Sequence, residues 1–287
     1  MSKNDIVKGY VEADGARLYY ERSGGGPDLV FIHAGIADRR MWDPQFDALA
    51  ERFRVTRYDG RGCGETRKFT VPFSPVRDLA ALMSALDIDK AHIVAASQGG
   101  GIALDYALDN PSAVLSLVLV APAVGGYQPE GAMPPKLQEL IEARRSGDLD
   151  RAAGLQVEIW ADGPNRESNQ VDEAVRERVR VMGREALELQ APHLKETGFL
   201  PEKEAETPAA ARLDGLAAPV LVLYGDEDDE MFGDVAEFLV SKMRRARWAV
   251  IPGAAHFPNL EKPSMFNRVV QDFIDRINPV PEAAFPT

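Results

Sequence analysis

The chain has 287 residues, of which 45% are hydrophobic and 27% are charged, and its formal net charge is −12 at pH 7. This composition suits an ordinary soluble α/β domain with a large core. The negative charge argues against nucleic acid or an anionic membrane surface as a partner, because both would repel it.

The cysteine count and the hydropathy pattern indicate the compartment. A single cysteine, Cys63, excludes an intrachain disulfide and fits a reducing environment. The N-terminal residues lack the apolar run of a secretory signal, and no stretch reaches the roughly 18 apolar residues of a membrane span. We therefore expect a cytoplasmic protein without a membrane partner. The sequence does not predict its oligomeric state.

The first part of the chain alternates strand and helix patterns. Residues 8–23 predict a hairpin with its turn at 13–15. The following patterns predict a strand at 28–33, a helix at 41–53, a strand at 54–59 and an amphipathic helix at 75–87. Such alternation is typical of a parallel sheet covered by helices.

A strand that runs directly into a helix marks the centre of the chain. Residues 91–96 are small or apolar and predict a buried strand, Ser97 follows at once, and a helical pattern begins immediately after it. The turn must therefore be very tight, and it leaves room only for small neighbours such as Ala95 and Gly99. This strand–turn–helix context makes a match to the G-x-S-x-G nucleophile motif credible, with Ala95 at the first glycine. The alternative is that Ser97 only caps the helix.

The second half of the chain contains a helical insertion between two strands. A continuous apolar strand is predicted at 114–120, and strand signals then vanish until 219–224. Helices are predicted at 136–146, at about 150–160 and over a third segment that includes Val171 to Ala186. The last strand is expected at 248–251 and the last helix at 263–277, followed by a mobile tail at 278–287.

Three motifs together resemble the α/β-hydrolase fold superfamily, in its lid-bearing esterase, lactonase and C–C hydrolase branch. They are the turn at Ser97, the Gly225-x-x-Asp228 spacing and the loop around His256. The resemblance implies an α/β fold with a mostly parallel eight-stranded sheet and an inserted all-helical cap. It assigns residues 1–123 and 215–287 to the two parts of the hydrolase core and residues 124–214 to the cap.

The resemblance also implies a catalytic triad in the chain order that this fold uses. Ser97 would be the nucleophile, His256 the base and acid, and Asp228 the residue that orients the histidine. Each follows a predicted parallel strand, so all three are expected at one edge of the sheet. Because Asp226 and Asp229 are close neighbours of Asp228, the identity of the acid remains open between them.

Two backbone N–H groups would complete the expected site. The resemblance places one oxyanion donor at Gly35, after the strand at 28–33, with Ala34 standing where the family has glycine. The second donor would be Gln98, directly after the nucleophile. Pocket-lining positions are expected at Ile36, Trp160 and Phe257.

The implied reaction is hydrolysis of a small or medium carboxylic ester or lactone through an acyl-enzyme, with a small molecule as the only partner. No metal and no organic cofactor are expected, because triad and oxyanion donors supply nucleophile, base and charge stabilisation. A mostly uncharged substrate is expected, since the surface is acidic and the motifs contain no cation to receive an anion. Arg39, Arg40 or an arginine of the cap could change this by turning inward.

Two other functions are compatible with the same residues. A C–C bond hydrolase acting on a β-diketone or dienoate, or a perhydrolase, would use the same triad. A receptor that binds a small ligand with little or no turnover would also fit.

Overall fold

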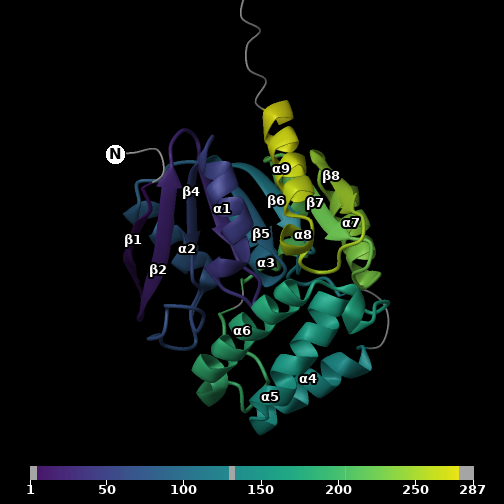
Figure 1. The fold of residues 1–287 in the computed structure, drawn as a ribbon. Helices are drawn as coiled ribbons and strands as arrows, with labels where there is room; N and C mark the ends of the chain where they lie inside the picture. The colour runs from purple at the N-terminus through teal and green to yellow at the C-terminus, as the bar shows by residue number, and fades with distance from the viewer. Residues whose placement is uncertain (1–4, 129–132, 204, 278–287) are drawn as a thin grey trace, which may run out of the picture.

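The computed structural model describes residues 5–128, 133–203 and 205–277, so the tail expected at 278–287 lies outside the described residues. Within these ranges, eight strands form one sheet in the order β1-β2-β4-β3-β5-β6-β7-β8 (Figure 1). Strands β1, β2 and β4 pair antiparallel, and all other neighbours pair parallel. The structure thus confirms the predicted α/β class with a mostly parallel sheet.

The strands are β1 (Val7–Ala13), β2 (Ala16–Gly24), β3 (Asp28–Ile32), β4 (Arg54–Tyr58), β5 (Ala91–Ala96), β6 (Val114–Val120), β7 (Val220–Gly225) and β8 (Ala246–Ile251). The α-helices are α1 (Asp43–Ala50), α2 (Pro75–Ala85), α3 (Gln98–Asp109), α4 (Pro135–Ser146), α5 (Leu149–Gln156), α6 (Glu173–Gln190), α7 (Met231–Lys242), α8 (Pro258–Glu261) and α9 (Pro263–Ile277). None of the helices in the described ranges combines the length and the hydropathy needed to cross a bilayer.

Helices cover both faces of the sheet, which explains the continuous apolar strands. In β3, Val30 packs into a core cluster shared with α2, α3 and α7, whereas Phe31 packs into a second cluster shared with α1 and α9. Successive side chains of a strand point to opposite faces, so both faces must be apolar when both are covered.

Two predicted helices differ from the observed ones for local reasons. The helix expected at 41–53 is a 3-10 turn at Arg39–Trp42 followed by α1, because Asp38 caps the 3-10 turn and Pro44 lies in the first turn of the α-helix, where proline is favoured. The helix expected at about 150–160 is α5, followed by a π-helical segment at Val157–Asp162.

Helices α4 to α6 form a separate layer between β6 and β7 in the chain. They lie beyond one end of the sheet (Figure 1). Their contacts include a small apolar cluster of their own, built around Leu140, Leu155 and Leu187. We refer to residues 133–203 as the helical insertion. Its inner side faces the sheet edge at which β5 ends.

Candidate functional site

The turn between β5 and α3 holds Ser97 in a strained conformation. Its φ of 52° and ψ of −119° are rare for a residue with a side chain, and such strain is concentrated at functional sites. The turn is fixed to β6, because Ser97 N donates to Val120 O over 2.8 Å. A Cβ at Gly99 would lie 2.6 Å from His33 O, so this position admits only glycine without movement of the backbone. The small neighbour expected from the sequence is therefore required by packing against β3.

A buried carboxylate and an imidazole meet beside this turn. Asp228 Oδ2 lies 2.8 Å from His256 Nδ1, and both residues are buried. The second oxygen, Asp228 Oδ1, accepts from Asp229 N over 2.9 Å. The two loops are packed tightly, since a Cβ at Gly225 would lie 1.9 Å from Ala254 O. An imidazole held in this way donates at Nδ1 and is free to accept a proton at Nε2.

The two neighbouring acids have other partners. Asp226 is exposed and accepts from Gly253 N over 2.6 Å. Asp229 accepts from Met231 N over 3.0 Å at the start of α7. Of the three candidates, Asp228 is the one that the structure places against His256.

The expected oxyanion donors lie on facing segments. Gly35 occupies the turn that Ala37 N closes by donating to Ala34 O over 2.9 Å, and Gln98 is the first residue of α3. The Gln98 side chain covers Gly35 closely, since a Cβ there would lie 2.1 Å from Gln98 Oε1. Gln98 Nε2 also donates to Glu202 Oε1 over 2.7 Å.

His33 holds the loop that contains Gly35. Its Nε2 accepts from Gly60 N over 2.8 Å, so Nδ1 carries the proton and donates to Ala34 O, also over 2.8 Å. This is the structural role that a histidine at a strand end can fill. It connects the loop after β3 to the glycine-rich turn after β4.

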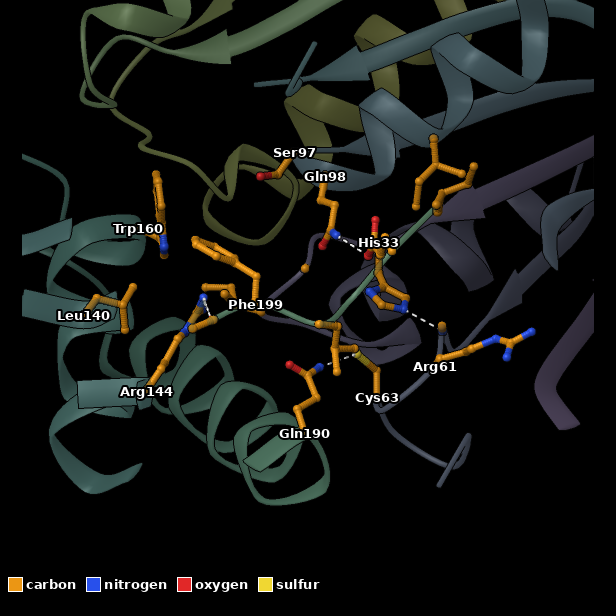
Figure 2. A pocket seen from close by; sticks show the side chains of 18 of the residues that line it. His33, Arg61, Cys63, Ser97, Gln98, Leu140, Arg144, Trp160, Gln190 and Phe199 are labelled. Carbon is orange, nitrogen blue, oxygen red and sulfur yellow. Dashed lines mark hydrogen bonds between the residues drawn. The ribbon is translucent and has the colours of Figure 1, made fainter. Parts of the chain in front are cut away.

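A cavity of about 490 Å³ joins these groups. Its wall includes Ser97, His256, Gly35 and Gln98, together with Ile36 and Trp160 from the expected pocket residues. Figure 2 shows Ser97, Gln98 and Trp160 around this cavity. The ring of Trp160 lies 4.6 Å from that of His256, and its carbonyl accepts from His256 N over 3.2 Å. Trp160 therefore both packs on the histidine and lines the cavity.

The expectation that Phe257 lines the pocket is wrong. Phe257 is not among the residues that form the cavity wall, and its side chain is fully buried in the core cluster beneath the sheet. Its ring meets that of the preceding His256 edge to face, with centroids 5.7 Å apart. Adjacent residues of this loop thus point in different directions.

The sequence did not single out Glu202, Arg61 or Arg144 as residues of the cavity wall, although it left open that an arginine of the cap turns inward. Burial raises the pKa of Glu202 to about 7, although its hydrogen bond from Gln98 opposes the shift. Burial lowers the pKa of Arg144, on α4, to about 10. By contrast, Arg39 and Arg40 pair with Asp59 and with Asp38 and Glu185, and they do not line the cavity.

Two other kinds of reactive centre, a thiol nucleophile and a metal site, can be examined in the described ranges. Burial raises the pKa of the Cys63 thiol well above its usual value, which leaves it a poor nucleophile. The described residues contain no group of three or more His, Cys, Asp or Glu side chains arranged to hold a metal ion.

Comparison with known proteins relates the chain to hydrolases. A family model described as alpha/beta hydrolase fold matches residues 27–263. The chain is 28% identical to a 2-hydroxy-6-oxononadienedioate/2-hydroxy-6-oxononatrienedioate hydrolase of Paraburkholderia xenovorans over 277 residues, which covers 92% of each protein. It is 26% identical to a pimeloyl-[acyl-carrier protein] methyl ester esterase of Aeromonas hydrophila, over 88% of this chain and 98% of that protein. Among solved structures, Est816, described as an N-acyl homoserine lactone degrading enzyme, aligns with a TM-score of 0.72 and 25% identity over 92% of this chain and all of that one.

Proposed function

The chain belongs to the alpha/beta hydrolase fold family, and we propose that it is a serine hydrolase that cleaves a small or medium carboxylic ester or lactone. The observation that carries this proposal is the 2.8 Å contact between buried Asp228 and His256, because His256 lines the same cavity as the strained Ser97. The esterase and lactonase among its relatives support the same reaction class. In this proposal residues 124–214, which include the helical insertion, form a cap that covers the site.

The first half of the proposed reaction forms an acyl-enzyme. Ser97 Oγ attacks the carbonyl carbon as His256 Nε2 takes the hydroxyl proton, and Asp228 stabilises the imidazolium that results. The carbonyl oxygen becomes an oxyanion, which the N–H groups of Gly35 and Gln98 stabilise by about 3 kcal/mol each. When the tetrahedral intermediate collapses, the bond to the leaving oxygen breaks and His256 returns the proton to it.

The second half regenerates the enzyme. Water takes the place of the leaving alcohol, His256 accepts its proton, and the hydroxide adds to the acyl carbon. When the second tetrahedral intermediate collapses, the bond between the acyl carbon and Ser97 Oγ breaks, His256 returns the proton to Oγ, and the carboxylic acid is released. The same residues would also support hydrolysis of a C–C bond next to a carbonyl, with carbon as the leaving atom. The relative of 28% identity from Paraburkholderia xenovorans is the observation that favours this second candidate.

A labelling experiment tests the nucleophile. A fluorophosphonate probe should label the wild-type protein at one serine, and the Ser97→Ala variant should lose both the label and the turnover of p-nitrophenyl esters. With EDTA present, a burst of one nitrophenolate per site followed by steady turnover is expected where deacylation is slow.

The same assay separates the alternatives. Labelling that survives in Ser97→Ala would overturn the assignment of the nucleophile. A stoichiometric burst without sustained turnover would favour the ligand receptor, and rapid cleavage of a vinylogous diketone beside negligible ester turnover would favour the C–C hydrolase.

A further inference from the structure

The cavity wall contains a cation, Arg144, that forms no ion pair with any residue in the described ranges. Arg144 extends from α4 of the helical insertion into the cavity that Ser97 and His256 line. Figure 2 shows its side chain next to Phe199, with Ser97 and Gln98 on the opposite side of the pocket. A ligand whose reacting carbon lies at Ser97 can therefore extend towards this guanidinium.

The contacts of Arg144 are weak for a charged group. Nη1 donates to Gly198 O over 3.4 Å, and the guanidinium lies 5.5 Å from the centre of the Phe199 ring. Nε is buried and has no hydrogen-bond partner among the described residues. Arg61, in the same wall, is different, because it binds both oxygens of Asp78 over 2.7 Å each.

The acid of the same cavity does not neutralise Arg144. Glu202 accepts from Gln98 over 2.7 Å, and in the described ranges it forms no ion pair with Arg144 and has no part in the shift of its pKa. Burial lowers the pKa of Arg144, and no acid among the described residues offsets this shift. At neutral pH the guanidinium is therefore still charged, partly desolvated and short of hydrogen-bond acceptors.

We propose that Arg144 receives a carboxylate of the substrate, so that the ester cleaved at Ser97 carries a free carboxylate at its far end. This inference rests on the proposed function and replaces the expectation of an uncharged substrate. A carboxylate matches the planar fork of a guanidinium and supplies the acceptors that Arg144 lacks. A dianion fits less well, because Glu202 lies in the same wall. The apolar wall residues Leu137, Leu140 and Ile102 suit a methylene chain between the two ends.

Matched pairs of esters test the proposal. The p-nitrophenyl monoesters of adipate and suberate carry the carboxylate, and p-nitrophenyl 6-methylheptanoate is a neutral ester of the same shape as the adipate. The wild-type enzyme should prefer the adipate or the suberate monoester in kcat/KM. The Arg144→Met variant should lose about 10- to 100-fold on the preferred monoester and less than about 3-fold on the neutral ester.

Two further variants control for structure. Arg144→Lys keeps the charge and should retain part of the preference. Arg145→Gln changes the exposed neighbour on the same helix and should change neither activity. A wild-type enzyme with no preference for either carboxylate ester, or an equal loss on both ester types in Arg144→Met, would overturn the inference.

A binding measurement separates this inference from the proposed function. Free hexanoate, titrated by calorimetry, should bind the wild-type protein and bind Arg144→Met at least about tenfold more weakly. This result does not depend on turnover. If the probe fails to label Ser97 and no ester is cleaved, the proposed function fails, whereas equal binding of hexanoate to both proteins refutes the role of Arg144 alone.

Discussion

Replacing Asp228 by asparagine tests the proposed mechanism with almost no change in shape. The carboxylate accepts two hydrogen bonds, from Asp229 N over 2.9 Å and from His256 Nδ1 over 2.8 Å. An asparagine offers one oxygen and one NH₂ group, so it cannot accept both. One of the two contacts must change.

The imidazole is the partner that can adapt. If the new NH₂ group faced Asp229 N, two donors would oppose each other in a buried site, at a cost of about 1–3 kcal/mol. If it faces His256, the ring can move its proton to Nε2 and accept at Nδ1. That arrangement satisfies both contacts, but it leaves Nε2 protonated and unable to take the proton of Ser97.

The expected result is a fall in kcat by about 10⁴-fold, or about 5 kcal/mol of transition-state stabilisation, by analogy with the same substitution in a well-studied triad. Steady-state hydrolysis of a p-nitrophenyl ester measures the loss, and the ¹⁵N chemical shifts of His256 report its tautomer. Urea unfolding should show that the variant remains folded.

The matched controls are Asp226→Asn and Asp229→Asn. The new asparagine still has an oxygen that accepts from the backbone donor, which is Gly253 N for residue 226 and Met231 N for residue 229. Each substitution should therefore lower kcat by less than about tenfold. The reasoning is refuted if Asp228→Asn keeps kcat within tenfold of wild type, or if one of the control changes is the damaging one.

Two other changes probe the cavity wall. Trp160→Ala removes the ring whose centre lies 4.6 Å from that of His256. The variant should show a changed ratio of kcat/KM between short and long acyl esters, while the probe still labels Ser97. An unchanged ratio would show that this ring does not shape the pocket. Glu202→Gln keeps an acceptor for Gln98 and removes a group whose pKa burial raises from 4.5 to about 7. In the unfolded chain Glu202 ionises at lower pH than in the folded protein, so the free energy of unfolding of the wild type falls as pH rises from about 4.5 to 7. By urea unfolding, the variant should therefore be about 1–3 kcal/mol more stable than the wild type at pH 8 and no more stable at pH 4. An equal difference at both pH values would show that the ionisation of Glu202 is not the cause.

The strand–turn–helix at Ser97 could be predicted because its constraints are local. A buried strand that meets a helix without a loop requires small neighbours, and these are visible in the sequence as Ala95 and Gly99. The reason for the glycine was not visible, since its contact with His33 O depends on the pairing of β5 with β3. The local sequence pattern thus predicted the strand–turn–helix, whereas tertiary packing explains why residue 99 is a glycine.

The loops after β7 and β8 show where local pattern fails. Three aspartates within four residues were candidates for the acid in the sequence, and the directions of their side chains depend on how Gly225 packs against Ala254. Phe257 was misassigned for a related reason. Its position next to His256 suggested that it lines the pocket. In a loop, however, the directions of neighbouring side chains follow no fixed period, and the Phe257 side chain packs into the core.

Substrate preference was the least predictable property, because the cavity wall combines segments that are far apart in the chain. Arg144 and Arg145 are adjacent and chemically identical, yet the first lines the cavity and the second is exposed. The helical period does contain a clue, since Arg144 follows Leu137 and Leu140 by seven and four residues on the inner face of α4. A cation on an apolar helix face costs folding free energy when nothing pairs with it. Proteins break such local rules mainly at functional sites. A guanidinium that forms no ion pair with the described residues is therefore better explained by a ligand than by the stability of the fold.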